Sequence, residues 1–308
     1  MTDLVVKSNK LVQALQTLNL NEARLLQLAI VDARETGQGL STEEPLELNA
    51  VRYAKAFNVS ADAAYLALSE AEDSLFKRQF TITNEDGTLT KSRWIQDANY
   101  RKGEGRILVT LTRVVIEHVT KIDGFEQYFT SYHLKKTADF KSVYAVRLYE
   151  LLMQWKAVGK TPAYELDRLR GQLGIGVNEY TRMEAFKRRV LDIAVDQINE
   201  HSDLIINYEQ HKKGRSISGF SFNFNYKRSL AHARKEIDVT ERPKIALTDA
   251  QRRMFAKKLS ELPEMSRYSE GTESYLEFAV RITKMLEDPK QLNTLLPLLK
   301  KLGFKEKH

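Results

Sequence analysis

Basic side chains that could bind an anionic polymer gather between residues 180 and 215, in the run YTRMEAFKRRVLDIAVDQINEHSDLIINYEQHKKGR. They are Arg182, Lys187, Arg188, Arg189, Lys212, Lys213 and Arg215. Guanidinium and ammonium groups donate hydrogen bonds to phosphate oxygens, and an arginine can also donate two parallel bonds to the O6 and N7 edge of guanine. The chemistry that these residues suggest is the recognition of nucleic acid.

The first half of this run has the periodicity of an amphipathic helix over about 179–200. The residues of its mainly apolar stripe recur at spacings of three and four: Met183, Phe186, Val190, Ile193, Ala194, Gln197 and Ile198. Cations in the first turns oppose the partial positive charge of a helix N-terminus, which costs roughly a few tenths of a kcal/mol each and favours a bound anion. The alternative is a solvated charged face, with Glu184 and Asp192 as local partners.

The second half predicts a β-hairpin with a basic tip. Leu204, Ile206 and Tyr208 fall at every second position, the turn lies within 211–215, and an apolar strand returns from Ile217. A helix with exposed cations beside a basic hairpin is typical of a winged helix-turn-helix. In such a module the helix enters the DNA major groove, and the hairpin, or wing, rests on the phosphate backbone.

The same order of elements occurs earlier in the chain. Residues 20–110 predict a helix opened by an Asn19–Glu22 capping box, a short strand, two helices joined by a turn, and β-hairpins. Residues 137–226 repeat this order without repeating the sequence. We therefore expect an α+β fold of tandem winged-helix (winged helix-turn-helix) domains with a helical C-terminal extension. The expected boundaries are 1–133 for the first winged-helix domain, 134–228 for the second, 229–247 for a linker and 248–308 for the extension.

Composition narrows the class of protein. The chain has 308 residues, a formal net charge of +7 and an isoelectric point near 9.3, which favours anionic partners. It has no cysteine, so disulfides and thiolate sites are excluded and a reducing cytoplasm is the expected location. The N-terminus lacks the features of a signal peptide, and no apolar run is long enough for a membrane helix, so we expect no membrane partner.

No constellation of residues predicts catalysis. A GxxxxGK[ST] phosphate-binding loop is absent. Gly171, Gly174 and Gly176 are interpreted as a helix turn because they precede no helix that follows a strand. The six histidines are scattered and form no HExxH motif, which gives little support to a zinc or relaxase-type metal site. The sequence therefore predicts a binding protein without catalytic residues, metal or cofactor, and not an enzyme.

Several of these runs resemble one family. The resemblance is most specific at Tyr180-Thr181-Arg182-Met183, Phe186-Lys187-Arg188-Arg189-Val190-Leu191, Ile198-Asn199, Tyr208 and Lys212-Lys213-Gly214-Arg215. The N-terminal runs Val6-Lys7-Ser8-Asn9-Lys10 and Asn21-Glu22-Ala23-Arg24 also fit. These residues are similar to those of the iteron-binding plasmid replication initiators, the bacterial Rep proteins with two winged-helix domains. The resemblance covers about residues 1–228.

The resemblance implies roles for individual residues. Arg182 and Arg188 match positions at which the family reads bases, and some relatives carry an acidic residue in place of Ala185. The residues expected to contact the DNA backbone are Tyr180, Lys187, Arg189, Lys212, Lys213 and Arg215. The first winged helix would bind the other end of the repeat and form a dimer interface; its weaker backbone contacts would be Lys91, Arg93, Arg101 and Lys102. Its predicted helix over 61–77 is less basic, which agrees with a partner-facing role.

The resemblance also implies partners. The expected function is sequence-specific initiation of plasmid replication: a monomer binds direct repeats at an origin in double-stranded DNA, aids origin opening and recruits the host replication initiator and replicative helicase. As a homodimer the protein would repress its own promoter. Two other functions stay open on the residues alone. One is a winged-helix transcriptional repressor that binds an inverted repeat. The other is a nicking initiator or nuclease, against which the missing histidine cluster argues.

Overall fold

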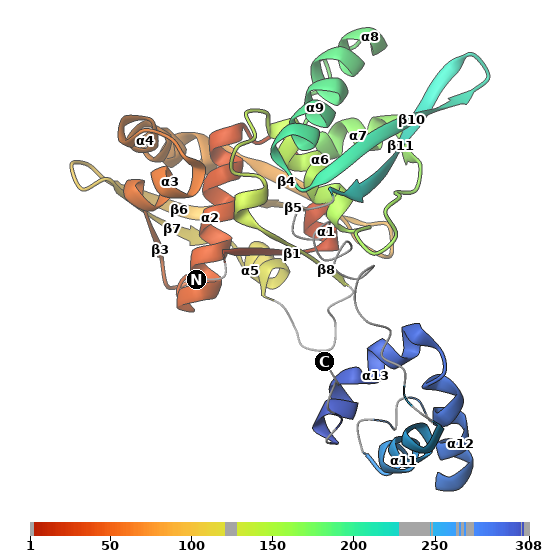
Figure 1. Cartoon of the computed structure of the whole chain (residues 1–308). Coiled ribbons are helices and arrows are strands. Elements are labelled where there is room, and N and C mark those ends of the chain that lie inside the picture. Colours follow the sequence, from red (N-terminus) through yellow and green to blue (C-terminus); the bar gives the residue numbers. More distant parts are fainter. Residues whose placement is uncertain are drawn as a thin grey trace. The chain divides into compact units, whose positions relative to one another are not determined.

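The computed structural model describes residues 3–120, 128–227, 247, 249–262, 265, 268, 274–302 and 304. The chain divides into two compact units, Met1–Lys227 and Arg228–His308 (Figure 1). Each unit has a hydrophobic core of its own. The expected linker over 229–247 lies outside the described residues except for Leu247.

A winged helix forms the N-terminal part of the first unit. Its elements are α2 (Leu20–Thr36), β3 (Leu46–Asn49), α3 (Ala50–Phe57), α4 (Ala61–Lys77), β6 (Ile95–Arg101) and β7 (Arg106–Leu111). The predicted capping box opens α2: the Glu22 N–H donates to Asn19 Oδ1 at 2.9 Å, and the Asn19 N–H donates to Glu22 Oε2 at 2.8 Å. Ser60 caps α4 by accepting from the Ala63 N–H at 3.2 Å. Local capping thus fixes where both helices begin.

A second winged helix completes the first unit. Its elements are α6 (Val143–Met153), β9 (Tyr164–Glu165), α7 (Leu166–Leu173), a helical segment over 183–201, β10 (Leu204–Lys213) and β11 (Ser216–Tyr226). The first of these helices was expected to begin near residue 137. It begins at Val143, because Ser142 caps it by accepting from the Tyr144 N–H and a separate 3-10 turn, η2 (Leu134–Lys136), precedes it.

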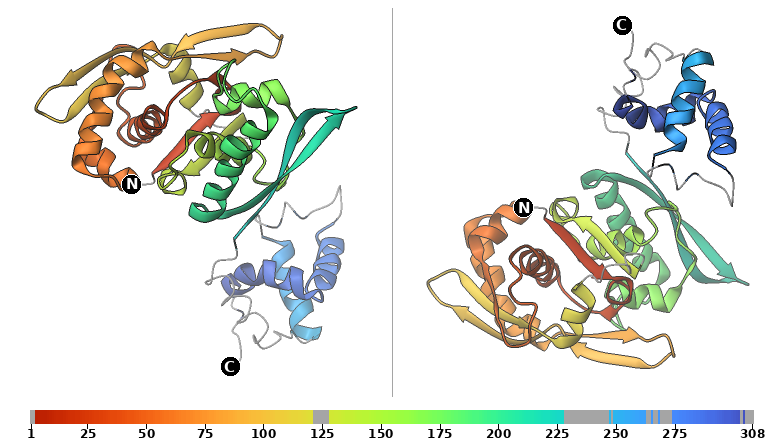
Figure 2. Two further views of the ribbon diagram at one scale, coloured as in Figure 1. Left: turned by 90° about the horizontal axis from the view of Figure 1, so that it is seen from above. Right: turned by 90° about the horizontal axis from the view of Figure 1, so that it is seen from below.

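The sheets of the two winged helices have the same strand order. It is β3-β7-β6 in the first and β9-β11-β10 in the second, with all neighbours antiparallel. In each sheet the central strand is the second strand of the wing, and it pairs with the short strand that follows the first helix. The long β10–β11 hairpin extends away from the body of the unit in both views of Figure 2. The predicted tandem winged-helix architecture is confirmed.

The remaining strands of the first unit lie outside the two winged-helix sheets. The first hairpin after α4 consists of β4 (Gln79–Thr83) and β5 (Leu89–Arg93). These strands join β2 (Leu15–Gln16) in a sheet of their own. The wing of the first winged helix is therefore the β6–β7 hairpin that follows. The N-terminal strand β1 (Leu4–Ser8) pairs with β8 (Phe129–His133), and the short helices α1 (Asn9–Val12) and α5 (Arg113–Val119) pack beside β1.

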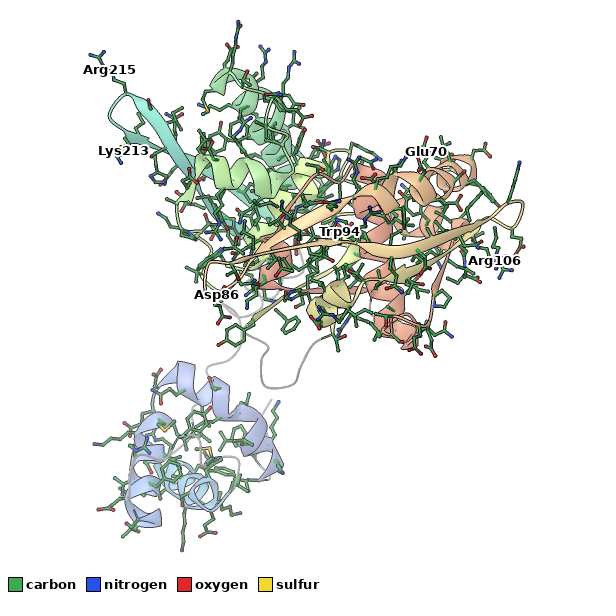
Figure 3. The ribbon with its side chains drawn as sticks, turned by 180° about the vertical axis from the view of Figure 1, so that it is seen from behind. Glu70, Asp86, Trp94, Arg106, Lys213 and Arg215 are labelled. Atoms are coloured by element: carbon green, nitrogen blue, oxygen red, sulfur yellow. The ribbon has the colours of Figure 1, made fainter. Side chains whose placement is uncertain are left out.

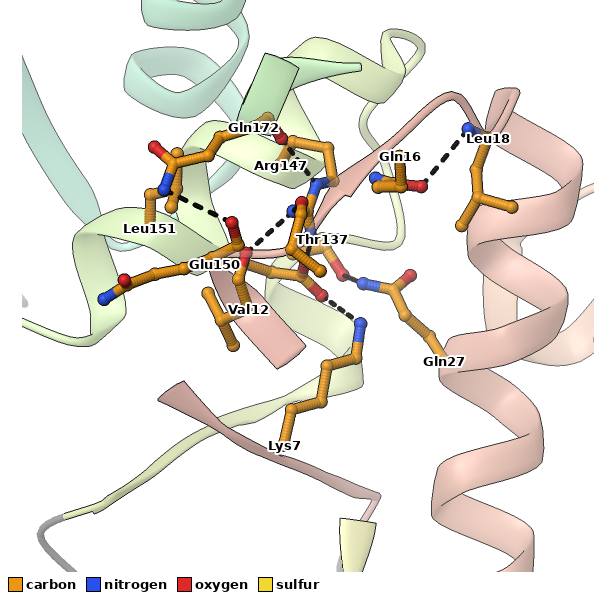
Figure 4. Close-up of polar contacts among 12 residues, drawn as sticks. Lys7, Val12, Gln16, Leu18, Gln27, Thr137, Arg147, Glu150, Leu151 and Gln172 are labelled. Atoms are coloured by element: carbon orange, nitrogen blue, oxygen red, sulfur yellow. Dashed lines mark hydrogen bonds and ion pairs between the residues drawn. The ribbon is translucent and has the colours of Figure 1, made fainter. Parts of the chain in front are cut away.

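A buried polar network ties the N-terminal strand to the second winged helix (Figure 4). Glu150 on α6 accepts from Lys7 Nζ at 2.5 Å, from the Tyr132 hydroxyl at 2.6 Å and from Arg147 Nη1 at 2.6 Å. Burial raises the pKa of the Glu150 carboxyl, but the charges of Lys7 and Arg147 outweigh burial, so its pKa lies below its usual value. A buried carboxylate with three donors is the arrangement in which burial of charge is tolerated.

Two buried arginines add main-chain contacts between the two winged helices. Arg147 Nη2 donates to the carbonyls of Val12 at 2.7 Å and Ala14 at 3.2 Å. Arg24, on α2, donates to the carbonyls of Ala138 at 3.0 Å and Phe140 at 2.8 Å. The first unit is thus held together by specific polar contacts as well as by one apolar core.

The second unit is a small helical body. Its helices are α11 (Asp249–Ser260), α12 (Tyr275–Met285) and α13 (Pro289–Lys301). Their apolar faces meet in a core that contains Phe255, Leu259, Ile282, Leu295 and Leu299. A capping box of Ser274 and Glu277 opens α12. The predicted helical extension is therefore present in the described part of 248–308.

Candidate nucleic-acid interface

The helical segment 183–201 occupies the position of a recognition helix. It runs without a break through α8 (Met183–Phe186), a π-helical turn (Lys187–Leu191) and α9 (Asp192–His201). The fully buried side chains along it are Phe186, Val190, Leu191, Ala194 and Ile198. A π turn inserts an extra residue into the helix, and it spans the neighbours Val190 and Leu191, which both point inward. Ile193, predicted on the apolar stripe, is instead 39% exposed.

The recognition helix begins at Met183, not at Glu179 as predicted. Tyr180 has a φ of 47°, which lies in the left-handed region that a right-handed helix excludes. Arg182 is the N-cap residue, and its exposed side chain makes no capping hydrogen bond. Arg182 therefore stands at the tip of the helix, where the N-terminal residues of recognition helices meet base edges.

Arg170, which the sequence analysis did not single out, holds the turn before the recognition helix. Its Nη1 donates to the Tyr180 carbonyl at 3.0 Å, and its Nη2 donates to the Glu179 carbonyl. Its guanidinium carbon lies 5.2 Å from the ring centroid of Phe186, a buried anchor of the helix. These contacts fix the left-handed residue and set the direction of the helix. Arg170 is one of two arginines in the short helix α7, and nothing in the sequence marks it for such a role.

Arg188 and Arg189 present their side chains to solvent on the π turn. The Arg188 side chain is 65% exposed, and its Nη1 lies 3.5 Å from Glu184 Oε1 one turn earlier. Such an exposed pair contributes only about 0.3–0.5 kcal/mol, so a stronger acceptor can displace the carboxylate. Arg189 is exposed and has no ion-pair partner among the described residues. Both guanidinium groups are available to an anionic ligand.

Lys187 lies against the wing and not in open solvent. Its Nζ donates to Gln210 Oε1 at 3.3 Å and lies 6.0 Å from the ring centroid of Tyr208. The Tyr208 hydroxyl donates to Asp192 Oδ1 at 2.7 Å, and burial together with this carboxylate raises the pKa of Tyr208. These bonds join the π turn and α9 to β10, so the helix and the wing are held as one surface.

The tip of the second wing is basic and exposed. Lys212, Lys213 and Arg215 are all exposed, and Lys213 and Arg215 point away from the body at the end of the hairpin (Figure 3). Gly214 has a φ of 64° as the first residue of a two-residue loop, a conformation that favours glycine. The tight turn leaves the side chains on either side of it directed outward, which suits contact with a phosphate backbone.

The first winged helix places its four predicted contacts at two different sites. Arg101 and Lys102 are exposed at the tip of the β6–β7 wing, as in the second winged helix. Lys91 and Arg93 lie on β5, in the separate sheet. Arg93 is engaged at the end of α4: its Nη1 donates to the Phe76 carbonyl at 2.9 Å, and its guanidinium carbon lies 5.0 Å from the Phe76 ring centroid.

The helix of the first winged helix that corresponds to the recognition helix, α4, carries the opposite charge. Its exposed side chains include Asp62, Glu70, Glu72 and Asp73, against one lysine, Lys77, which pairs with Asp73 at 2.5 Å. Glu70 lies on the outer side of α4 (Figure 3). An acidic helix repels phosphate, so the cations that could hold DNA are concentrated in the second winged helix.

Within the described residues, no group of three or more His, Cys, Asp or Glu side chains is arranged to hold a metal ion. None of the described helices combines the length and the apolar character needed to cross a bilayer. The candidate functional site of the described residues is therefore the basic surface formed by the recognition helix and the β10–β11 wing, which is chemically suited to binding a polyanion.

Comparison with protein families matches both winged helices. Residues 4–153 match the family described as "Initiator Replication protein, WH1", and residues 165–224 match "Initiator Rep protein, WH2". The first match includes α6, whose contacts to α7 and α9 place it structurally in the second winged helix. Residues 225–308 lie beyond both matches.

Comparison with individual proteins points the same way. The chain is 23% identical over 226 residues to an uncharacterized 27.6 kDa protein of Escherichia coli, covering 69% of this chain and 92% of that protein. It is 27% identical over 160 residues to the PI protein of Escherichia coli, covering 47% of this chain and 52%, about half, of that protein. The crystal structure of Pi initiator protein in complex with iteron DNA has a TM-score of 0.62 at 20% identity. It covers 74% of this chain and 99% of that one, so the two share a fold.

Proposed function

Because this chain belongs to the initiator replication (Rep) protein family, we propose that it initiates plasmid replication by binding direct repeats, or iterons, in double-stranded origin DNA. The observation that carries the proposal is the surface of the second winged helix. Arg182, Arg188 and Arg189 are exposed at and near the start of its recognition helix, beside a wing with a basic tip. The Pi initiator protein, which shares the fold, was solved bound to iteron DNA, which supports the proposal.

Arg182 and Arg188 are the proposed base readers. They lie at the N-cap and in the π turn, so both belong to the end of the helix that recognition helices insert into the major groove. Arginine is the side chain best suited to guanine, because its planar group donates to O6 and N7 together. Ala185, between them, has no polar side chain and can contribute only apolar contact.

The proposed backbone contacts are Tyr180, Lys187, Arg189, Lys212, Lys213 and Arg215. Lysines and arginines at an exposed hairpin tip bind phosphate without reading sequence, so they set affinity and its dependence on salt. Lys187 would act from its position against β10, where a small rotation about its long side chain exchanges Gln210 for a phosphate oxygen. The wing and the helix act together because Tyr208 and Asp192 bind them to each other.

The first winged helix has a secondary role in this proposal. It contributes weak backbone contacts from Arg101 and Lys102, with Lys91 and Arg93 at the β4–β5 hairpin, and a surface for a second copy of the chain. The proposed functional boundaries are 1–133, 134–228, a linker over 229–247 and an extension over 248–308. The proposal further includes action in the cytoplasm as a monomer at the repeats, recruitment of the host replication initiator and replicative helicase, and autorepression by a homodimer. No catalytic step is part of it.

Binding to arrays of repeats tests the proposal. DNA fragments from the origin of the same replicon, carrying one, two or three copies of the repeat, are titrated with protein, and the bound mass is measured by mass photometry. Each added repeat should add the mass of one 35.5 kDa chain. A constant dimer on a fragment with a single inverted repeat would instead favour a transcriptional repressor, and metal-dependent nicking of supercoiled DNA would favour an enzyme.

A further inference from the structure

A cavity of about 610 Å³ lies between the two winged helices of the first unit. From the first winged helix, its lining includes Asn19, at the start of α2, and Arg78, the C-cap residue of α4. From the second, it includes Lys141, which precedes α6, and Arg189 on the recognition helix. The cavity is therefore bordered by the end of one candidate recognition helix and by the exposed side of the other.

Two cations line this cavity without an ion-pair partner among the described residues. They are Lys141 and Arg189, both exposed. Arg78 also lines the cavity, but its charge is offset by buried Glu22, which it contacts at 2.8 and 3.0 Å. The acidic group that lines it, Glu179, binds the Gly176 N–H at 2.8 Å. The balance of unpaired charge is positive, so the cavity favours an anion.

The position of Lys141 is fixed by the recognition helix. Gln197 on α9 accepts from the Lys141 N–H at 2.7 Å and from the Ser142 N–H at 3.0 Å. The main chain of Lys141 therefore cannot drift away from α9, while its ammonium group stays exposed. Tyr144, which also lines the cavity, packs edge-on against Tyr180 with ring centroids 6.1 Å apart, so the turn before the recognition helix supports this side chain of the lining.

We infer that this interdomain cavity binds the DNA backbone between the parts of a repeat contacted by the two winged helices, with Lys141 and Arg189 donating to its phosphate oxygens. The inference rests on the proposed function and deepens it. DNA that lies along α9 and also reaches the first winged helix must pass the cavity between them. A phosphate bound there fixes the spacing between the two contacted segments of DNA. It also holds the DNA near the first winged helix, whose acidic α4 does not attract phosphate.

The test compares Lys141→Gln with the matched control Lys156→Gln. Lys156 is an exposed lysine beyond the opposite end of α6 and does not line the cavity. The Lys141 bond to Gln197 is made by the main chain, so glutamine at position 141 keeps it. Affinity for a single repeat is measured at 50 and 200 mM salt, and ethylation interference maps the phosphates that each protein needs. Thermal unfolding verifies that both variants are folded.

One lost phosphate contact lowers the salt slope by about 0.9, so the weakening caused by Lys141→Gln should shrink about 3.5-fold between 50 and 200 mM salt. Interference at the phosphates in the middle of the repeat should be lost, while interference at the wing and recognition-helix phosphates remains. A variant that behaves like Lys156→Gln, or that weakens binding equally at both salts, overturns the inference and leaves the proposed function intact. Failure of the unsubstituted protein to bind repeats would instead overturn the proposed function.

Discussion

Replacing Arg188 by alanine should relax base preference at one position of the DNA site while the fold stays intact. The side chain is 65% exposed, and its pairing with Glu184 at 3.5 Å is worth about 0.3–0.5 kcal/mol. Alanine also has the higher helix propensity, so the free energy of unfolding should change by less than about 0.5 kcal/mol. A bidentate arginine–guanine contact contributes about 1–3 kcal/mol of discrimination. The preference for guanine at that position should therefore fall about 5- to 150-fold.

The assay is competition binding at one fixed salt concentration, with a panel of DNA sites in which each base pair of the repeat is replaced in turn. Arg188→Ala should lose preference at one guanine and keep it elsewhere. Arg113→Ala is the matched control, because Arg113 is also an exposed arginine paired with a glutamate one turn away, Glu117, but lies on α5. If Arg188→Ala weakens binding to every member of the panel equally, Arg188 does not read a base.

Three further predictions concern the wing, the turn and the buried network. Lys213→Ala should weaken binding to all sequences alike and lower the salt slope by about 0.9, measured by titration at several salt concentrations; a change in base preference would contradict this. Arg170→Ala removes two bonds to main-chain carbonyls and a contact with Phe186, so denaturant unfolding should show a loss of about 2 kcal/mol, with DNA affinity falling on every sequence; unchanged stability would refute its positioning role. Glu150→Gln leaves buried Lys7 without its carboxylate and should cost about 3–5 kcal/mol at neutral pH. The pKa of Glu150 is lowered in the folded state, so the Glu150 carboxylate stabilises the fold above the ordinary glutamate pKa of about 4.3, and this stabilisation is lost as pH falls through the folded value. The free energy of unfolding, measured from pH 7 to pH 3, should therefore depend less on pH in the variant.

Much of the architecture could be predicted because it is encoded locally. The Asn19–Glu22 capping box and the Ser60 cap mark helix starts in the sequence, and both are present in the structure. The alternation of β10 and the glycine at position 214 predicted the second wing for the same reason. Where the information is short-range, periodicity and turn chemistry suffice.

The errors arise where distant residues or backbone irregularities decide the structure. The pairing of β1 with β8 joins segments more than a hundred residues apart, and no local sequence pattern predicts it. The left-handed Tyr180 shortens the recognition helix, because Arg170 stabilises a conformation that tyrosine does not favour by itself. Two hairpins follow α4, and the sequence does not indicate which of them is the wing, since a turn signal does not reveal which sheet its strands join.

The candidate interface was predictable in composition but not in geometry. The cluster of basic residues on one helix and one hairpin follows from the sequence alone. Three features of the interface depend on tertiary packing. They are the contact of Lys187 with Gln210, the contact of Arg93 with the end of α4, and the position of Lys141 in the same cavity lining as Arg189. The sequence therefore identifies the basic cluster, and the structure shows which of its side chains are exposed and which contact neighbouring elements.

Iteron binding by a monomer can be tested by footprinting the full-length protein on the DNA upstream of its own gene and across the adjacent origin, at moderate salt and with the stoichiometry of each complex determined. We expect protection of several evenly spaced direct repeats, each occupied by one chain. Protection of a single palindrome by a dimer, or no protection at any concentration below that of non-specific binding, would rule out iteron binding by a monomer.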